Sequence, residues 1–204
     1  MNPIEDTQAW LEAAVIGLNL CPFAKAVHGK GQIRWVESGA TQPRELLGDL
    51  VAELKALDAA DPEAIDTTLL VCPLALGDFL DFNDFLDVAE GAIDDLGLEG
   101  RLQIAAFHPL FQFDGTEPDD PGNFSNRAPH PTLHLLREDS LDRAVASFPE
   151  AETIYERNIE TLRGLTPAQW RAVFGARAPQ GRAGGSGAAA TAAATPGRPP
   201  APAS

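Results

Sequence analysis

Two short, largely apolar segments constrain the fold of this chain most strongly. They are TTLLVC (67–72) and LQIAAF (102–107), and neither alternates between apolar and polar residues. Uninterrupted apolar strands of this kind are usually buried on both faces, in sheets that helices cover on each side. Apolar residues recur at helical spacing over 81–97, between the two segments. The pattern therefore predicts a strand–helix–strand unit in a layered domain.

The rest of the chain continues the alternation. Helical spacing is expected over 5–18 and from Pro43 onward, and strands are expected at 32–36 and 132–136. Shorter helices are predicted over 141–148, where Ser140 would be the N-cap, over 151–163, and from a capping box at 166–169. We predict an α/β fold with a three- to four-stranded, at least partly parallel sheet flanked by helices. A ferredoxin-like α+β arrangement is the alternative, because the pattern defines only the order of elements along the chain.

Composition divides the chain into two parts. The segment 178–204 has no acidic residue, no aromatic residue and no large aliphatic residue. Such a segment cannot bury enough apolar surface to offset the entropy lost on ordering. We therefore expect a single globular domain over 1–177 and a disordered tail rich in Ala, Gly and Pro over 178–204. Nothing in the pattern specifies an oligomeric state or a cofactor.

The balance of charge excludes several classes of partner. The 204 residues include 30 acidic and 15 basic ones, with a formal net charge of −15. A field of this sign repels nucleic acid and anionic membrane surfaces, so neither is an expected partner. The N-terminus has neither the basic nor the apolar region of a secretory signal, and no apolar run approaches the ~20 residues of a membrane span. A cytoplasmic location with reduced cysteines is expected.

Basic and imidazole groups gather in one stretch of this acidic chain. FSNRAPHPTLHLLRE (124–138) contains two arginines and two histidines. If all the strands were parallel, Cys72, His108 and Arg137 would follow three of them at the same edge of the sheet, where open α/β sheets bind ligands. We therefore predict that this stretch forms a wall of a site for a small anionic molecule. An antiparallel fourth strand would remove Arg137 from the group.

The connection 109–131 has no sustained period of 2 or 3.6. Long connections of this kind in compact domains are usually functional or disordered, and the phenylalanines here favour an ordered lid. Asn126 and Arg127 are its candidate ligand-binding groups, because a guanidinium can hold a carboxylate or phosphate with two hydrogen bonds. A salt bridge from Arg127 to the acids of the same loop is the alternative, as is a loop packed only for stability.

Three further side chains are candidates for chemistry. His108, at a strand end, is placed for acid–base work. His134 is expected within a strand, as a second ligand contact or as a hydrogen-bonded core histidine. Cys21 would be a nucleophile if a helix N-terminus lowered its pKa, and otherwise a packed thiol. A metal site from Cys21, Cys72, His108 and His134 lacks any close ligand pair, so no metal is predicted.

Three segments of the sequence resemble one known family. They are VIGLNLCPFA (15–24), FHPLFQFDGTEPDDPGNFSNRAPHPTLHLLRE (107–138) and IYERNIETLR (154–163). Together they resemble a bacterial family catalogued as domain of unknown function 1415, over about residues 10 to 170. The resemblance implies that six candidates belong to the family's motifs, and it implies no reaction. These candidates are Cys21, His108, Asn126, Arg127, His134 and Arg137.

Three hypotheses for the function follow. The first is an enzyme acting on a small anionic metabolite, with His108 and Cys21 as catalytic groups and with Asn126, Arg127, His134 and Arg137 as substrate contacts. The second is a non-catalytic metal- or cofactor-binding protein that uses Cys21, His108 and His134. The third is an adaptor domain whose motif loop is structural.

Overall fold

A four-stranded mixed sheet forms the centre of the protein. The computed structural model describes residues 2–147, 153–175 and 178. The strands are β1 (Ile33–Glu37), β2 (Thr67–Val71), β3 (Leu102–Phe107) and β4 (Thr132–Arg137). Their order is β1-β2-β4-β3, with β1 and β2 parallel and β4 antiparallel to both of its neighbours. The predicted α/β fold with a partly parallel sheet is confirmed.

The direction of β4 corrects one prediction about the site. Val71 of β2 and Phe107 of β3 both pair with Thr132, at the start of β4. Cys72 and His108 therefore follow strands at the same edge of the sheet. Arg137, at the end of β4, pairs with Leu102 at the opposite edge. Six-residue strands separate the two edges by roughly 17–20 Å, so placing Arg137 beside His108 was wrong.

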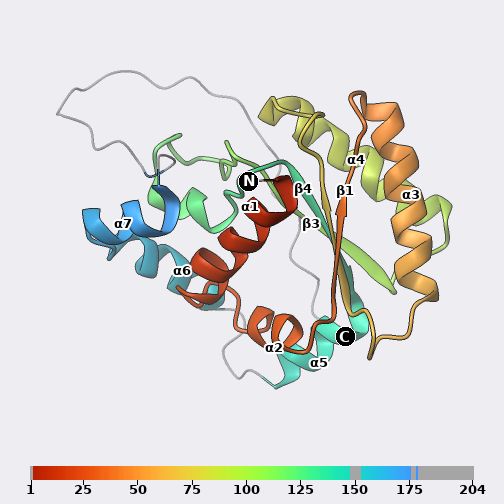
Figure 1. Ribbon diagram of the computed structural model, residues 1–204, viewed down its shortest axis with the longest axis horizontal. Helices are drawn as coiled ribbons and strands as arrows, with labels where there is room; N and C mark the ends of the chain where they lie inside the picture. Colours follow the sequence, from red (N-terminus) through yellow and green to blue (C-terminus); the bar gives the residue numbers. More distant parts are fainter. Residues whose placement is uncertain (1, 148–152, 176–177, 179–204) are drawn as a thin grey trace.

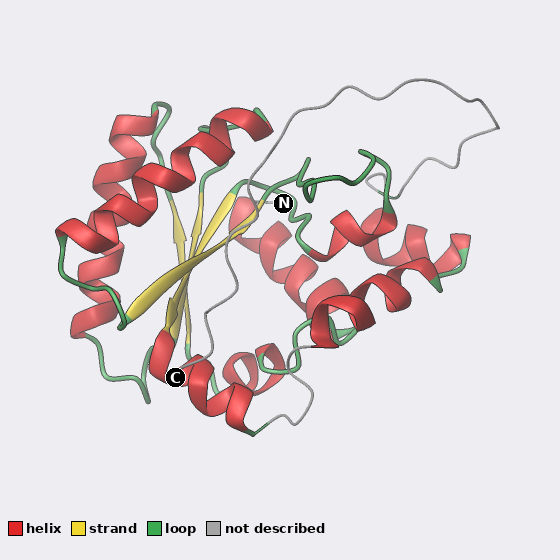
Figure 2. Ribbon diagram, turned by 180° about the vertical axis from the view of Figure 1, so that it is seen from behind, coloured by secondary structure: helices red, strands yellow, loops and turns green. Residues whose placement is uncertain are grey.

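Helices cover both faces of the sheet. Figure 1 views the sheet nearly edge-on, with α3 (Pro43–Ala59) and α4 (Phe79–Asp95) on one side. Figure 2 shows the same layers from behind. The other side carries α1 (Pro3–Trp10), the π-helix η1 (Leu11–Ile16), α6 (Ile154–Arg163) and α7 (Pro167–Phe174). The short helices α2 (Ala24–Gly29) and α5 (Glu138–Ala146) lie near the end of the sheet where β4 finishes, and the 3-10 helix η2 (Pro121–Ser125) interrupts the connection 109–131.

Local sequence signals account for several helix ends. Asp78 caps α4 by accepting hydrogen bonds from the N–H groups of Leu80 and Asp81. The predicted capping box at Thr166 and Gln169 is present. The predicted cap at Ser140 was wrong, because α5 begins at Glu138, directly after β4, and the Ser140 hydroxyl instead donates to Asp66.

Each face of the sheet has its own hydrophobic cluster. On the α3–α4 side, α3 contributes leucines that are fully buried at helical spacing, namely Leu46, Leu50, Leu54 and Leu57. On the other side, Trp10 and Leu11 pack with Phe124 of the long connection and with Leu162 of α6. The long connection is thus part of the second core, in agreement with the prediction that it is ordered.

The π-helix depends on a glycine. The N–H of Gly17 donates to the carbonyl of Glu12, a bond that spans five residues. A Cβ atom at Gly17 would lie 2.3 Å from the carbonyl oxygen of Ala13, so any larger residue would push the turn apart. Leu11 and Val15 of this helix are buried in the cluster that includes Ile33 and Phe107 of the sheet.

The predicted tail, except Ala178, lies outside the described residues. Among the helices that are described, none is long and apolar enough to cross a membrane.

Candidate functional site

His108 is held on both sides of its ring. Nδ1 accepts a hydrogen bond from the Leu110 N–H at 3.0 Å, so Nε2 carries the proton and donates to the Leu76 carbonyl at 3.0 Å. The residue is fully buried and packs against Phe79 and Phe82 of α4. Burial lowers the pKa of His108. With both nitrogens occupied, the ring fixes Leu76, a non-glycine residue at φ +56°.

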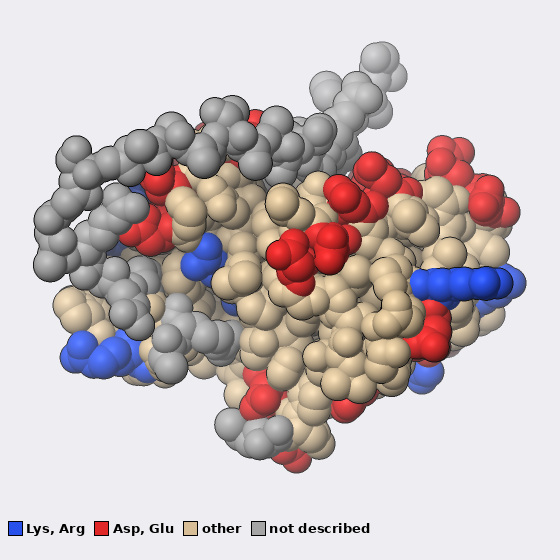
Figure 3. All heavy atoms as spheres, turned by 90° about the horizontal axis from the view of Figure 1, so that it is seen from above, with Lys and Arg blue, Asp and Glu red and all other residues tan. Residues whose placement is uncertain are grey.

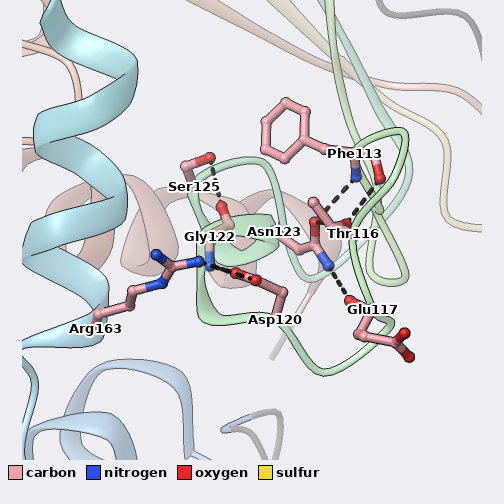
Figure 4. Close-up of polar contacts among 8 residues, drawn as sticks. All are labelled: Phe113, Thr116, Glu117, Asp120, Gly122, Asn123, Ser125 and Arg163. Carbon is pink, nitrogen blue, oxygen red and sulfur yellow. Dashed lines mark hydrogen bonds and ion pairs between the residues drawn. The ribbon is translucent and has the colours of Figure 1, made fainter.

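A buried asparagine organises the long connection. Asn123 is fully buried, and its Oδ1 accepts from the Phe113 N–H at 3.0 Å and from the Thr116 hydroxyl at 2.9 Å (Figure 4). Its Nδ2 donates to the Glu117 carbonyl at 2.9 Å. These three bonds close the loop 113–117 onto η2.

Asn126 and Arg127 also hold the connection in place. Asn126 Nδ2 donates to the Ala106 carbonyl of β3 at 3.2 Å. Arg127 lies with its guanidinium carbon 4.5 Å from the centre of the Phe124 ring, and it donates to the Phe111 and Pro118 carbonyls. The two Arg127 bonds use its Nε and Nη2 donors, which also form one of the edges with which a guanidinium grips an anion.

Arg137 closes the C-terminal end of α3. Its Nη2 donates to the carbonyls of Leu57 at 2.5 Å and Ala60 at 2.8 Å, and its Nε donates to Ile65 at 3.3 Å. Carbonyls at a helix C-terminus carry partial negative charge and lack helical partners, so a guanidinium is well matched to them. Arg127 and Arg137 thus serve different elements and do not form one clamp.

The Arg137→Met variant should therefore lose stability. We expect a decrease of about 2 kcal/mol in the free energy of unfolding, because a hydrogen bond to a charged group contributes about 1.5–3 kcal/mol. Urea denaturation would measure it. Arg101→Met is the matched control: Arg101 pairs with Asp58 at an exposed position, and its loss should cost less than about 1 kcal/mol. Equal losses of stability in the two variants would contradict the role of Arg137 at the end of α3.

The other face of the sheet contains a cavity of about 260 Å³. Its walls come from every strand of the sheet and from the helices α1, η1, α2 and α5. Trp10, Phe107 and His134 form an aromatic part of this lining, with ring centres 5.1 Å apart for Trp10–Phe107 and 5.9 Å for Phe107–His134. Leu11 and Val15 of the π-helix line it as well.

Two polar atoms among the residues lining the cavity lack a partner. The indole Nε1 of Trp10 and the imidazole Nε2 of His134 are buried and form no hydrogen bond with any described residue. A buried polar group without a partner costs about 1–3 kcal/mol, and a ligand or water that reached either atom would remove this cost. Burial lowers the pKa of His134 to about 4, so the ring is neutral near pH 7.

Cys21 lies in the same lining, and Cys72 does not. Burial raises the pKa of the Cys21 thiol, the opposite of the lowered value expected for a nucleophile at a helix start. Cys72 is fully buried on the α3–α4 side, where burial raises the pKa of its thiol to about 12.

The sheet separates the four residues of the metal hypothesis. Cys72 and His108 contact the α3–α4 side, and Cys21 and His134 line the cavity on the other side. Across the part of the chain that the structure describes, no three His, Cys, Asp or Glu side chains gather in a group that could hold a metal ion. The set Cys21, His108 and His134 therefore does not converge.

The fold and the cavity define a mixed α/β protein with a mostly apolar chamber on one face of its sheet. A family model described as "Protein of unknown function (DUF1415)" matches residues 2–172, and the chain belongs to this family. The resemblance seen in the sequence is thereby confirmed. Neither a curated protein nor a solved structure matches the chain.

Several residues of the cavity were not predicted as site residues. Trp10 and Phe107 were assigned to a helix face and a strand, because an apolar residue that lines a cavity has the same spacing as one that fills a core. Ala144 of α5 also lines the cavity, although it lies more than a hundred residues from Trp10 in the sequence. Only the tryptophan carried a usable signal, since a buried indole N–H normally needs a partner.

Proposed function

We propose that the protein binds a small, largely apolar molecule in the cavity between the sheet and the helices α1, η1, α2 and α5. The observation that carries the proposal is the pair of unpartnered polar atoms, Trp10 Nε1 and His134 Nε2, on residues that line an otherwise mostly apolar chamber. Ligand sites commonly combine an apolar lining with a few polar groups that orient the ligand.

The size and polarity of the cavity favour a neutral aromatic ligand. An engineered apolar cavity of about 150 Å³ binds benzene, so a larger chamber of about 260 Å³ suits a molecule with two fused rings. Trp10 and Phe107 offer surfaces for stacking. The Trp10 N–H would donate to an acceptor on the ligand, and the neutral His134 ring would accept or donate according to its tautomer.

This proposal replaces the anionic metabolite expected from the sequence. An anion needs positive charge, and the arginines expected to supply it contact carbonyls: Arg127 in the loop and Arg137 at α3. His108, the expected acid–base group, has both ring nitrogens occupied. Three predicted site residues line the cavity together, namely Cys21, His134 and Arg137. Because the Arg137 guanidinium donates to the Leu57 and Ala60 carbonyls, we propose only Cys21 and His134 as ligand contacts, without assigning a reaction.

Binding is tested with three fused-ring probes that differ in polarity: naphthalene, 2-naphthol and quinoline. We expect quinoline, which accepts a hydrogen bond, to shift the Trp10 indole resonance in a ¹H–¹⁵N NMR spectrum, with the resonance assigned from Trp10→Phe. A probe at a hundred times its dissociation constant should stabilise the fold by about 2.7 kcal/mol.

A matched pair of alanine substitutions on α5 provides the control. Ala144 lines the cavity and Ala146 is exposed. Ala144→Phe should fill the chamber and weaken binding at least about tenfold, whereas Ala146→Phe should leave it unchanged. If no probe moves the Trp10 resonance, or if both variants bind equally well, the cavity is not a ligand site.

A further inference from the structure

Strand β3 forms an edge of the sheet, and a cleft of about 770 Å³ lies beside it. We propose that this cleft, called the β3 cleft below, binds an extended, basic segment of a partner protein as an additional strand. The site is separate from the cavity of the proposed function, because the cavity lies on one face of the sheet and the cleft follows the edge formed by β3. Strand addition to an exposed edge is a recurring way for proteins to recognise peptides.

The outward direction of the β3 backbone follows from three hydrogen bonds. In an antiparallel pair, alternate residues direct both backbone groups to the partner, and the residues between them direct both away. The Glu138 N–H donates to the Arg101 carbonyl across the β3–β4 ladder, so the odd-numbered residues of β3 face β4. The Ala106 carbonyl, on the opposite side, accepts from Asn126, and the Leu102 N–H donates to Leu98.

Four backbone groups on the outer side of β3 consequently have no partner among the described residues. They are the Leu102 C=O, the Ile104 N–H and C=O, and the Ala106 N–H. Unpaired groups in a row along an edge are a template for another strand. Ile104 is half-buried and lines the cleft, so an incoming strand would replace water at its backbone.

The wall opposite β3 is formed by α4 and the start of the long connection. Leu86, Ile93 and Phe111 contribute apolar surface to the β3 cleft. An added strand directs alternate side chains to one face of the sheet, and those on the α4 side would contact this surface. Alternating apolar residues in the partner segment are therefore expected.

Negative charge surrounds the β3 cleft. Its lining includes no Lys or Arg, and it includes five acids that form no salt bridge with a described residue, namely Glu90, Asp94, Glu99, Asp114 and Glu138. Acidic side chains are also spread over the face at the carboxyl ends of β1, β2 and β3, seen in Figure 3. Complementary charge attracts a basic partner and repels a second copy of this chain, whose net charge is −15.

The test uses a probe peptide of alternating lysine and valine, six residues long, acetylated and amidated, with the full-length protein. Hydrogen exchange of the Ile104 amide is measured by NMR, and affinity is measured by calorimetry. We expect exchange at Ile104 to slow at least about tenfold with saturating peptide. Two control peptides separate charge from strand pairing: one replaces every lysine by glutamate, and the other carries an N-methyl group on every amide.

A matched pair of protein variants locates the contact. Glu90→Gln, in the cleft, should weaken binding about threefold or more, and Glu12→Gln, on the opposite side of the sheet, should have no effect. Protection of Ile104 by the basic peptide alone supports the proposal. If the N-methylated peptide bound as tightly as the unmodified basic peptide, the attraction would be electrostatic only and the proposal would be overturned. Unchanged exchange at Ile104 in the presence of the basic peptide would overturn it as well.

Discussion

Replacing Asn123 with leucine is expected to lower the free energy of unfolding by about 3 kcal/mol. The side chain forms hydrogen bonds with Phe113, Thr116 and Glu117 while fully buried. Each neutral hydrogen bond contributes about 1 kcal/mol, and the groups left without a partner in a buried loop add their own cost. Leucine has a similar size and can form none of these bonds, so the loss reports the polar network.

Urea denaturation of Asn123→Leu and of Ser125→Ala would measure this effect. Ser125 is the matched control, because it belongs to the same 3-10 helix and its hydroxyl donates to Gly122 at a half-buried position. Its removal should cost about 1 kcal/mol or less. A similar small change in both variants would mean that the network in Figure 4 contributes little to holding the long connection.

Lowering the pH from 7 to 4 is expected to destabilise the protein partly through His134. Burial lowers the pKa of His134 in the folded protein to about 4, from an ordinary value of 6.5. Between these pH values His134 binds a proton in the unfolded chain and not in the folded protein. The contribution of His134 to stability is therefore fully present above about pH 6.5 and is lost as the pH falls toward 4. The difference corresponds to about 3 kcal/mol at most.

The comparison is between wild type and His134→Gln, each denatured with urea at intervals from pH 7 to pH 4. The wild type should lose up to about 3 kcal/mol more than the variant over this range. His108, whose pKa burial also lowers, acts in the same direction and is present in both proteins, so it cancels. Parallel pH profiles would show that the His134 ring accepts a proton without penalty in the folded state.

The elements of the fold were predictable because their signals are local. Continuous apolar runs gave β2 and β3, and helical spacing gave α3 and α4, with boundaries that differ by a few residues at most. The direction of β4 was not predictable in this way. Its pairing partners, β2 and β3, are distant in sequence, and a strand pattern is the same in either direction.

In the candidate site, too, the residue types were predictable from the sequence and their distant partners were not. The basic groups of 124–138 were correctly seen as unusual, but each contacts a different part of the molecule. Arg127 holds the loop, His130 lies 3.3 Å from Asp6 of α1, and Arg137 closes α3. His134 lines the cavity, and part of Arg137 does as well. Residue type indicates which bonds a side chain can form, and the partner depends on which distant element the fold brings beside it.

The central position of β4 also has a consequence for how the chain acquires its structure during synthesis. When residues 1–107 have emerged, β1 and β2 can pair, but β3 has no neighbour until residues 132–137 are made. The sheet is completed by inserting a late strand between two early ones, after a long loop has closed. Contacts of this separation fold slowly and leave strand edges open meanwhile, so a nascent chain that stalls before β4 would be a natural client for chaperones.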